Sequence, residues 1–119
     1  MHSLDQIDRS DIQYARVSET HQIGVEKQYD KIVAPLVARK VPLWVHFDVD
    51  CIRRSEMAAV AFPSDDGLSF EQVVYLLKRV RSETEVLGMT VCCYRPSMDP
   101  IGNDAERLIG ALTEVLAAG

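Results

Sequence analysis

The chain has 119 residues, of which 47% are hydrophobic and 26% are charged, as is typical of one folded domain rather than a disordered segment. Its net charge of −5 argues against nucleic acid as a partner, and no run approaches the roughly 18 apolar residues of a membrane span. The polar, acidic start MHSLDQIDRSD does not have the form of a signal peptide, which predicts a cytoplasmic protein. Three cysteines, two of them adjacent, argue against a disulfide framework and for reduced thiols.

The N-terminal part of the chain carries two strand signals and one helix signal. Residues 12–18 (IQYARVS) predict a short strand. Residues 24–40 place apolar side chains at helical spacing, and Pro35 among them predicts a kink or a break. The run PLWVHF at 42–47 is apolar and aromatic, and it predicts a further strand.

A long loop is expected next, over residues 51–68, with a helical turn or a short strand in its middle at 56–62. The following helix has clear start signals, because Ser69 can cap it and Gln72 lies three positions further on. The buried stripe expected on this helix consists of Phe70, Val73, Val74, Leu77 and Val80.

The C-terminal part predicts one more strand, over residues 85–94, and a last helix capped by Asn103. The predicted order is β-α-β-α-β-α. The two clearest strands are continuous apolar runs, which is typical of parallel strands covered by helices on both faces. We therefore expect an α/β fold with a parallel β-sheet and flanking helices.

Two carboxylates follow the strand at 42–47. Side chains two positions apart share a face of a strand, so Trp44, His46, Asp48 and Asp50 start on one face. Ligands of parallel sheets bind at the carboxyl ends of the strands, and closely spaced carboxylates favour Mg²⁺ or Mn²⁺. Two alternatives stay open. Strand-end aspartates often only cap a loop, and in a phosphatase-type DxD the first aspartate is a nucleophile, although Ile52 stands where that class has Thr or Val.

Three spaced blocks carry a family resemblance. The segments HFDVDCI at 46–52, GLSFEQ at 67–72 and LGMTVCCYRPSMDP at 87–100, followed by a closing helix, resemble the C-terminal part of the ureohydrolase family, which comprises arginases, agmatinases and formimidoylglutamases. Members of that family carry a segment like SFDVDxLDPxxxPxxGxPxxGGLxxxE and a later strand like GxDxxExxPxxD. The spaced blocks together are much more specific than the DxD alone.

The resemblance implies an arginase-like three-layer α/β/α fold, present here only in part, with residues 1–119 as a single C-terminal α/β domain. It also implies a dinuclear Mn²⁺ centre, whose bridging hydroxide attacks a guanidinium or formimino carbon. In the family pattern the two DxD aspartates are metal ligands, which here are Asp48 and Asp50.

Several positions depart from the family pattern. Arg53 and Arg54 follow the DxD motif where the family has an aspartate and a proline, and Cys93 aligns with a glutamate that binds the substrate guanidinium. A thiol cannot make that bidentate contact. The family's other metal ligands lie upstream of any matching segment, and His2 and His21 are expected at the surface.

The same residues allow other sites. An arginine guanidinium could take the cation's place between Asp48 and Asp50, or both arginines could be solvated on the loop. His46, Cys93 and the two aspartates could together bind Zn²⁺. Cys93 could also be a nucleophile with His46 as its base, if the thiol pKa were lowered. The candidate pocket residues are thus His46, Cys93, Arg53 and Arg54.

Three functions remain open. The first is a catalytically silent domain that binds manganese weakly or not at all and acts by self-association as a homo-oligomer, because a parallel sheet without its upstream strands exposes an apolar edge. The second is one half of a split manganese-dependent hydrolase of linear amidines, completed by another chain. The third is a small binding module that uses the pocket at the strand ends.

Overall fold

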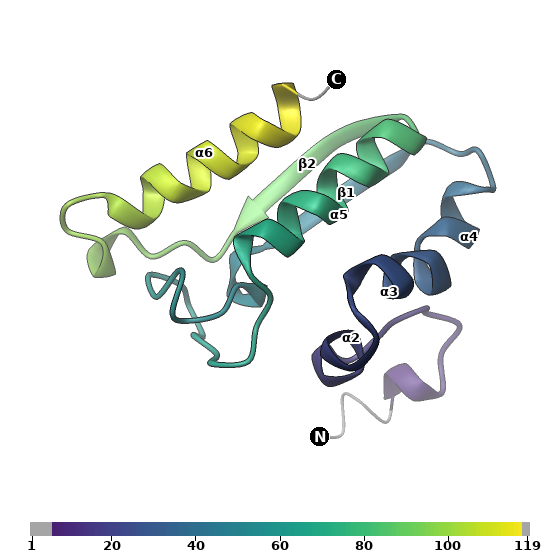
Figure 1. Ribbon diagram of the computed structural model, residues 1–119, viewed down its shortest axis with the longest axis horizontal. Coiled ribbons are helices and arrows are strands. Elements are labelled where there is room, and N and C mark those ends of the chain that lie inside the picture. Colours follow the sequence, from purple (N-terminus) through teal and green to yellow (C-terminus); the bar gives the residue numbers. More distant parts are fainter. Residues whose placement is uncertain (1–5, 118–119) are drawn as a thin grey trace.

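The computed structural model describes residues 6–117, which form a two-stranded parallel sheet with helices packed against it (Figure 1). In chain order the elements are α2 (Val17–Ile23), α3 (Val25–Ile32), α4 (Ala34–Val37), β1 (Leu43–Asp48), the 3-10 helix η1 (Val49–Cys51), α5 (Phe70–Glu83), β2 (Val86–Cys92), the 3-10 helix η2 (Pro96–Met98) and α6 (Asn103–Ala117). The predicted α/β class and parallel sheet are confirmed. Across residues 6–117, no helix is both long enough and apolar enough to cross a membrane.

The strand predicted over residues 12–18 is wrong. Residues 12–16 have no regular secondary structure, and α2 begins at Val17. Glu19 accepts a hydrogen bond from the backbone N–H of Arg16 at 3.3 Å, which fixes the first turn of this helix. Ile12 is 64% exposed. Strand propensity depends on a partner strand and on burial, and neither is provided at this place.

The helix predicted over residues 24–40 is present as two helices, and the break predicted from Pro35 is confirmed. The helix α3 ends at Ile32 and α4 begins at Ala34, so Pro35 lies in the first turn of α4. A proline is tolerated there because the first N–H groups of a helix have no partner within it.

The side chains of β1 alternate between a covered and an open face. Val45 and Phe47 pack in the core, whereas Trp44 is 63% exposed and His46 is exposed as well. Figure 1 shows α5 lying along the sheet on its covered side. The opposite face, defined here as the open face, carries Trp44, His46, Gly88 and Thr90. Within residues 6–117 no helix covers it, so the expectation of helices on both faces is not met.

The open face has a compact local structure. Strands β1 and β2 are paired in parallel, which places Trp44 opposite Gly88 and His46 opposite Thr90. The indole Nε1 of Trp44 donates a hydrogen bond to Thr90 Oγ1 at 2.9 Å. A Cβ atom at position 88 would lie 2.5 Å from the Trp44 ring, so only glycine lets the ring lie flat against β2.

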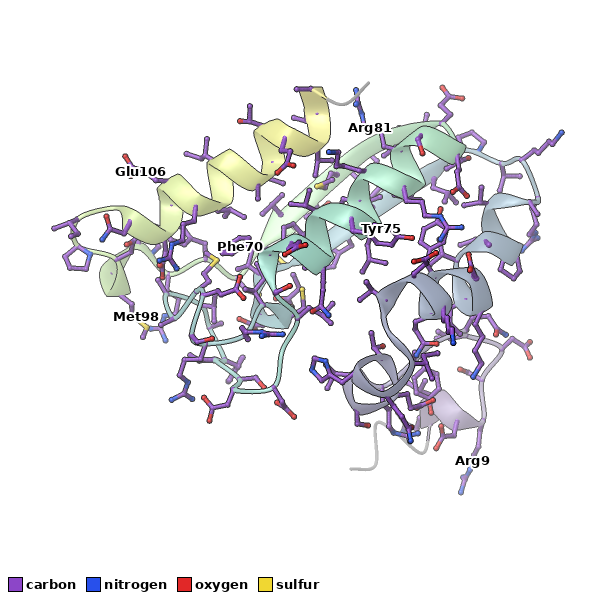
Figure 2. The ribbon with its side chains drawn as sticks, viewed as in Figure 1. Arg9, Phe70, Tyr75, Arg81, Met98 and Glu106 are labelled. Atoms are coloured by element: carbon purple, nitrogen blue, oxygen red, sulfur yellow. The ribbon has the colours of Figure 1, made fainter. Side chains whose placement is uncertain are left out.

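The start of α5 follows its sequence signals. Ser69 accepts a hydrogen bond from the N–H of Gln72 at 3.0 Å, and the Gln72 side chain accepts one from the N–H of Ser69 at 2.9 Å. The predicted stripe is half-buried at Phe70 and buried at its other four positions. In Figure 2, Phe70 lies on the side of α5 near α6, and Tyr75 lies on the side of the N-terminal helices.

The start of α6 differs from the prediction, because Asn103 does not act as its cap. The carboxylate of Asp99 accepts hydrogen bonds from the N–H groups of Asp104 at 3.1 Å and Ala105 at 2.9 Å, and from the Tyr94 hydroxyl at 2.7 Å. These contacts hold the pKa of Asp99 below its usual value, with the Tyr94 hydrogen bond as the main cause.

The loop over residues 51–68 supplies a deeply buried part of the core. Ile52, Met57 and Val60 are fully buried. Three isolated bridges tie this loop to itself and to the segment after β2, namely Ile52 with Leu68, Arg53 with Ser64, and Val60 with Tyr94. The segment 56–62 therefore contributes a single bridge rather than a helical turn.

Arg79 of α5 connects the N-terminal helices to the rest of the domain. Its guanidinium carbon lies 4.0 Å from the centre of the Tyr29 ring, and it donates hydrogen bonds to Asp30 at 2.6 Å and to Glu83 at 2.8 Å. Tyr29 is 1% exposed, and its hydroxyl donates to Glu83 at 3.3 Å. Burial, together with the Glu83 carboxylate, raises the pKa of Tyr29 to about 12.

Candidate functional site

The ends of the two strands meet as the sequence predicts. Asp48 is the last residue of β1, and its partner in the parallel register is Cys92, the last residue of β2. Both side chains are half-buried. Asp48 Oδ1 accepts a hydrogen bond from the N–H of Asp50 at 2.9 Å, which starts the 3-10 turn η1. One carboxylate oxygen of Asp48 is therefore held by the backbone, and the other has no role in that turn.

Asp50 does not continue the face of the strand, which corrects the periodicity argument. The chain leaves the extended conformation at Asp48, so Asp50 lies in η1. Its Oδ1 accepts a hydrogen bond from the N–H of Phe62 at 3.1 Å, which ties η1 to the loop over residues 51–68. This is the loop-capping alternative for a strand-end aspartate. Metal binding by Asp48 and Asp50 stays a prediction.

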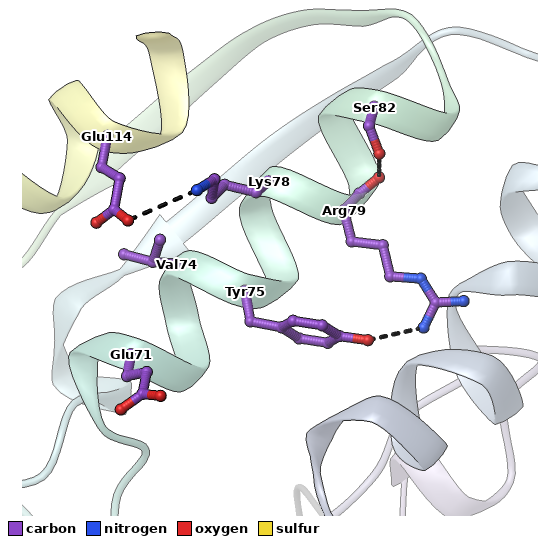
Figure 3. Close-up of a pocket in the computed structure, with 7 residues that line it drawn as sticks. All are labelled: Glu71, Val74, Tyr75, Lys78, Arg79, Ser82 and Glu114. Carbon is purple, nitrogen blue, oxygen red and sulfur yellow. Dashed lines mark hydrogen bonds and ion pairs between the residues drawn. The ribbon is translucent and has the colours of Figure 1, made fainter. Parts of the chain in front are cut away.

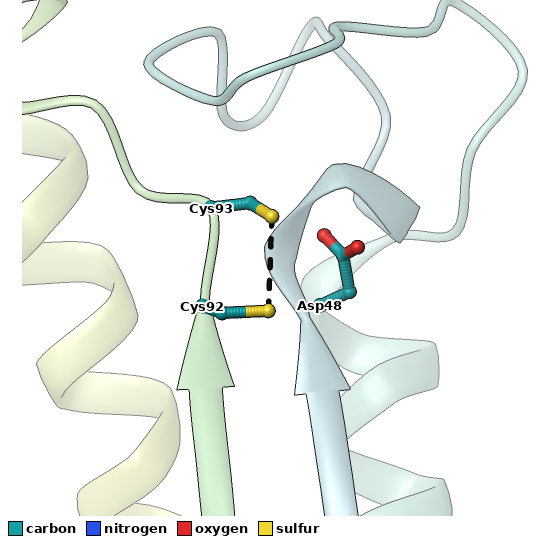
Figure 4. A group of neighbouring side chains, drawn as sticks. All are labelled: Asp48, Cys92 and Cys93. Atoms are coloured by element: carbon teal, nitrogen blue, oxygen red, sulfur yellow. Dashed lines mark hydrogen bonds between the residues drawn. The ribbon is translucent and has the colours of Figure 1, made fainter.

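The sequence reasoning missed Cys92. In the described part of the chain, Asp48, Cys92 and Cys93 form a group whose ligand atoms all lie within 4.8 Å of one another (Figure 4). The two sulfur atoms are 3.7 Å apart, and Cys92 Sγ lies 3.5 Å from His46 Nε2. The sequence could have indicated Cys92, because the last residues of two paired parallel strands lie side by side, and Cys92 ends the strand predicted next to the one that ends at Asp48.

Cys93 has an unusual backbone conformation that brings its thiol to this group. Its φ is +77°, in the left-handed region that non-glycine residues rarely adopt. Adjacent side chains in a strand point to opposite faces, but the reversed φ turns Cys93 back, and Figure 4 shows both sulfur atoms on the side of Asp48. The backbone of Cys93 is held by a hydrogen bond from the N–H of Ala61 to its carbonyl oxygen at 3.0 Å.

The electrostatics argue against Cys93 as a nucleophile. The hydrogen bond with Cys92, burial and the Asp48 carboxylate raise the pKa of the Cys93 thiol well above its usual value. A protonated thiol is a poor nucleophile. His46, the proposed base, lies against Cys92 rather than Cys93. The nucleophile hypothesis therefore has neither the required pKa nor the required contact.

The two arginines after the DxD motif do not take the place of a cation. Arg53 forms an ion pair with Glu56 at 3.7 Å, and Arg54 forms one with Asp65 at 3.3 Å. The side chain of Arg54 is 55% exposed, as expected for a solvated loop residue. The alternative of solvated arginines thus holds for Arg54, whereas Arg53 is half-buried beside Glu56. His21 is exposed as expected, and its Nε2 lies 2.6 Å from the carbonyl oxygen of Asp66, whereas His2 falls outside the described residues.

A groove of about 510 Å³ runs along the outer side of α5, away from the strand ends (Figure 3). Side chains that line the groove form an ion pair and a hydrogen bond. Lys78 forms an ion pair with Glu114 of α6 at 3.6 Å, and Arg79 donates to the Tyr75 hydroxyl at 3.0 Å. Because these charges already have partners, the groove lacks the convergent polar groups of a ligand site.

Comparison with known proteins settles the family. The family model described as "Arginase family" matches residues 2–118, which is nearly the whole chain. This chain belongs to the arginase family. Arginase-1 of Oryctolagus cuniculus is 23% identical to it over 108 residues, which cover 90% of this chain and 34% of the relative. Arginase-1 of Homo sapiens is 22% identical over the same length.

Solved structures of the family share the fold. The arginase of Bacillus caldovelox superposes with a TM-score of 0.86 at 15% identity, covering 96% of this chain and 38% of that one. The formimidoylglutamase of Bacillus subtilis gives a TM-score of 0.84 at 13% identity, covering 93% and 35%. This arginase-family chain thus spans about a third of the length of the relatives it matches.

The strand-end group of this arginase-family chain does not fit a pair of manganese ions. Manganese prefers carboxylate, carbonyl and water oxygens in octahedral geometry. Among the described residues, the group offers one carboxylate, from Asp48, together with two sulfur atoms. Asp50 lies outside this group, and its Oδ1 accepts the hydrogen bond from the N–H of Phe62. These residues alone therefore do not provide the oxygen ligands of a dinuclear manganese centre.

Proposed function

We propose that this chain is a catalytically silent arginase-family domain that acts by self-association through its open face. The observation that carries the proposal is the exposure of Trp44, which is 63% accessible on a sheet face that no helix of the described chain covers. In the two-stranded sheet each strand also has one edge without a partner strand. Apolar faces and open edges of this kind are typical interaction surfaces.

The proposed lack of hydrolysis follows from the donor set. The family resemblance requires several oxygen and imidazole ligands around two metal ions, and it requires a carboxylate that binds the guanidinium group. At the corresponding positions this chain has two half-buried aspartates, Asp48 and Asp50, and the thiol of Cys93. A thiol that keeps its proton cannot replace a carboxylate in binding a guanidinium cation.

The test measures oligomeric state and activity on the same protein. Light scattering after size-exclusion chromatography should give a dimer or a larger oligomer, and no urea should form from arginine or agmatine in the presence of Mn²⁺. Trp44 is the only tryptophan of the chain, so its fluorescence reports on the open face directly. Its emission should shift to shorter wavelength as the protein concentration rises and the ring is buried.

A matched pair of variants assigns the surface. Trp44→Lys should give a monomer. Ile109→Lys on α6 alters a side chain that is also 63% exposed, and it should leave the oligomer intact. A monomeric wild-type chain, or an oligomer that only Ile109→Lys disrupts, contradicts the proposal. Urea release by the chain alone contradicts the proposed silence.

A second candidate function rests on the coverage of the relatives. Since this chain matches about a third of each relative, another chain that carries the remaining part could pair with the open strand edges and supply the missing metal ligands. That arrangement is a split hydrolase of linear amidines. A neighbouring gene product with a DxHxD motif is the partner to test. Mn²⁺-dependent urea release that occurs only after mixing supports this alternative, and its absence with a stably bound partner rejects it.

A further inference from the structure

We propose that His46, Asp48, Cys92 and Cys93 form a Zn²⁺ site at the carboxyl ends of the two strands. The site uses sulfur ligands that the family resemblance does not include. It shares His46 with the open face, but its test does not depend on the proposed self-association. The four side chains come from two strands whose ends are fixed by the parallel register, in which Asp48 lies opposite Cys92.

Two separations between ligand atoms match tetrahedral zinc. With Zn–S bonds of about 2.3 Å and tetrahedral angles, two sulfur ligands lie about 3.8 Å apart, and a sulfur and an imidazole nitrogen lie about 3.5 Å apart. The observed distances are 3.7 Å between Cys92 Sγ and Cys93 Sγ, and 3.5 Å between Cys92 Sγ and His46 Nε2. An oxygen of Asp48 lies within 4.8 Å of both sulfur atoms, whereas His46 joins this group of three through its contact with Cys92.

The left-handed backbone at Cys93 supports a ligand role. Such a conformation costs about 1–3 kcal/mol for a non-glycine residue, and strain of this kind is concentrated at functional sites. Here its effect is to place two consecutive thiols on one side of the strand end, which an extended backbone cannot do. The N–H of Asp50 holds Asp48 Oδ1. This hydrogen bond fixes the orientation of the Asp48 carboxylate, as hydrogen bonds to metal ligands commonly do.

The donor set selects zinc over manganese. Two thiols, one imidazole and one carboxylate are the usual ligands of Zn²⁺, whereas Mn²⁺ prefers oxygen ligands. Binding replaces two S–H bonds by two Zn–S bonds and releases two protons to solvent, with no change of oxidation state. The binding reaction therefore needs neither an oxidant nor a reductant. With four protein ligands the coordination is closed, as in structural zinc sites.

The experiment titrates the reduced chain with Zn²⁺ in competition with a chromophoric chelator, and repeats the titration with Mn²⁺. We expect one Zn²⁺ per chain and no comparable binding of Mn²⁺. Cys92→Ser and Cys93→Ser should each weaken Zn²⁺ binding by roughly 100-fold. Cys51→Ser is the matched control, because Cys51 is exposed and outside the group, and it should bind as the wild type does.

Cobalt provides an independent readout. Co²⁺ bound by two thiolates should give an intense sulfur-to-metal absorption band that either serine variant weakens. His46→Gln should weaken zinc binding while the thiolate band remains. Circular dichroism of each variant verifies that it is folded. Equal affinity for Mn²⁺ and Zn²⁺, equal losses in the Cys51 control, or a cobalt complex without a thiolate band would each overturn the proposal and leave a cluster of hydrogen-bonded thiols. An oligomer that persists without zinc would leave the proposed self-association standing.

Discussion

Replacing Gly67 by alanine should destabilise the domain by about 2–3 kcal/mol. An added Cβ would lie 2.7 Å from the backbone nitrogen of Arg53 and 2.7 Å from the carbonyl oxygen of Cys51. Both are backbone atoms, which cannot rotate away, so the two segments must separate. Separation stretches the hydrogen bonds from Arg53 N to Leu68 O at 2.8 Å and from Leu68 N to Cys51 O at 2.7 Å. Each is worth about 1 kcal/mol, and the lost packing of the fully buried Ile52 adds to them.

Urea unfolding followed by circular dichroism at one fixed protein concentration measures this effect. Gly110→Ala is the control, because Gly110 lies inside α6 and an added Cβ there meets nothing within 4 Å. That variant should gain about 0.5–1 kcal/mol from helix propensity. If Gly67→Ala unfolds at the wild-type midpoint, or if the two variants shift together, then close backbone contact is not the reason for glycine at position 67.

Three further predictions concern single residues elsewhere. Lys40 has a φ of +56°, so Lys40→Gly should stabilise the chain by about 1 kcal/mol, whereas Arg39→Gly should not; equal effects in thermal melts would refute this. The pKa of Tyr29 is about 12 in the folded chain, and its ordinary value is 10.0. The stabilisation that the protonated Tyr29 adds to the folded state is therefore complete below pH 10 and is lost as the pH rises through 12. Tyr29→Phe should flatten this alkaline loss in pH-dependent unfolding, and an unchanged slope contradicts the assignment. Gly88→Ala should displace the Trp44 ring and break its 2.9 Å hydrogen bond, which unchanged tryptophan fluorescence would exclude.

The parts of the fold that the sequence predicts well are those in which local signals agree with burial. The capped start at Ser69 and the break at Pro35 depend on backbone chemistry within a few residues, and both occur where predicted. The strand over residues 12–18 was predicted from propensity alone and is absent, because its apolar side chains have no partner strand to bury them.

The candidate site shows the same limit. Its position at the end of β1 could be predicted, since a buried strand that runs into DxD marks an edge of a parallel sheet. The direction of Asp50 could not, because it depends on the turn that Asp48 begins and on the loop that supplies the N–H of Phe62. The position of the Cys93 thiol could not be predicted either, because it depends on the positive φ of Cys93, and the alternation of side chains along a strand does not reveal that angle.

The position of Arg79 has a consequence for how the domain opens. The polar contacts that join α3 to α5 run through this single guanidinium and the two carboxylates beside it. The apolar contact of the N-terminal helices is a small cluster around Tyr29, Val37 and Val80, whereas the larger main core lies between the sheet, α5 and α6. The N-terminal helices should therefore detach as a separate cooperative unit before the rest of the domain unfolds. Their amide hydrogens should then exchange with solvent faster than those of the sheet. The expected intermediate has unfolded N-terminal helices and an intact sheet, including the ends of both strands.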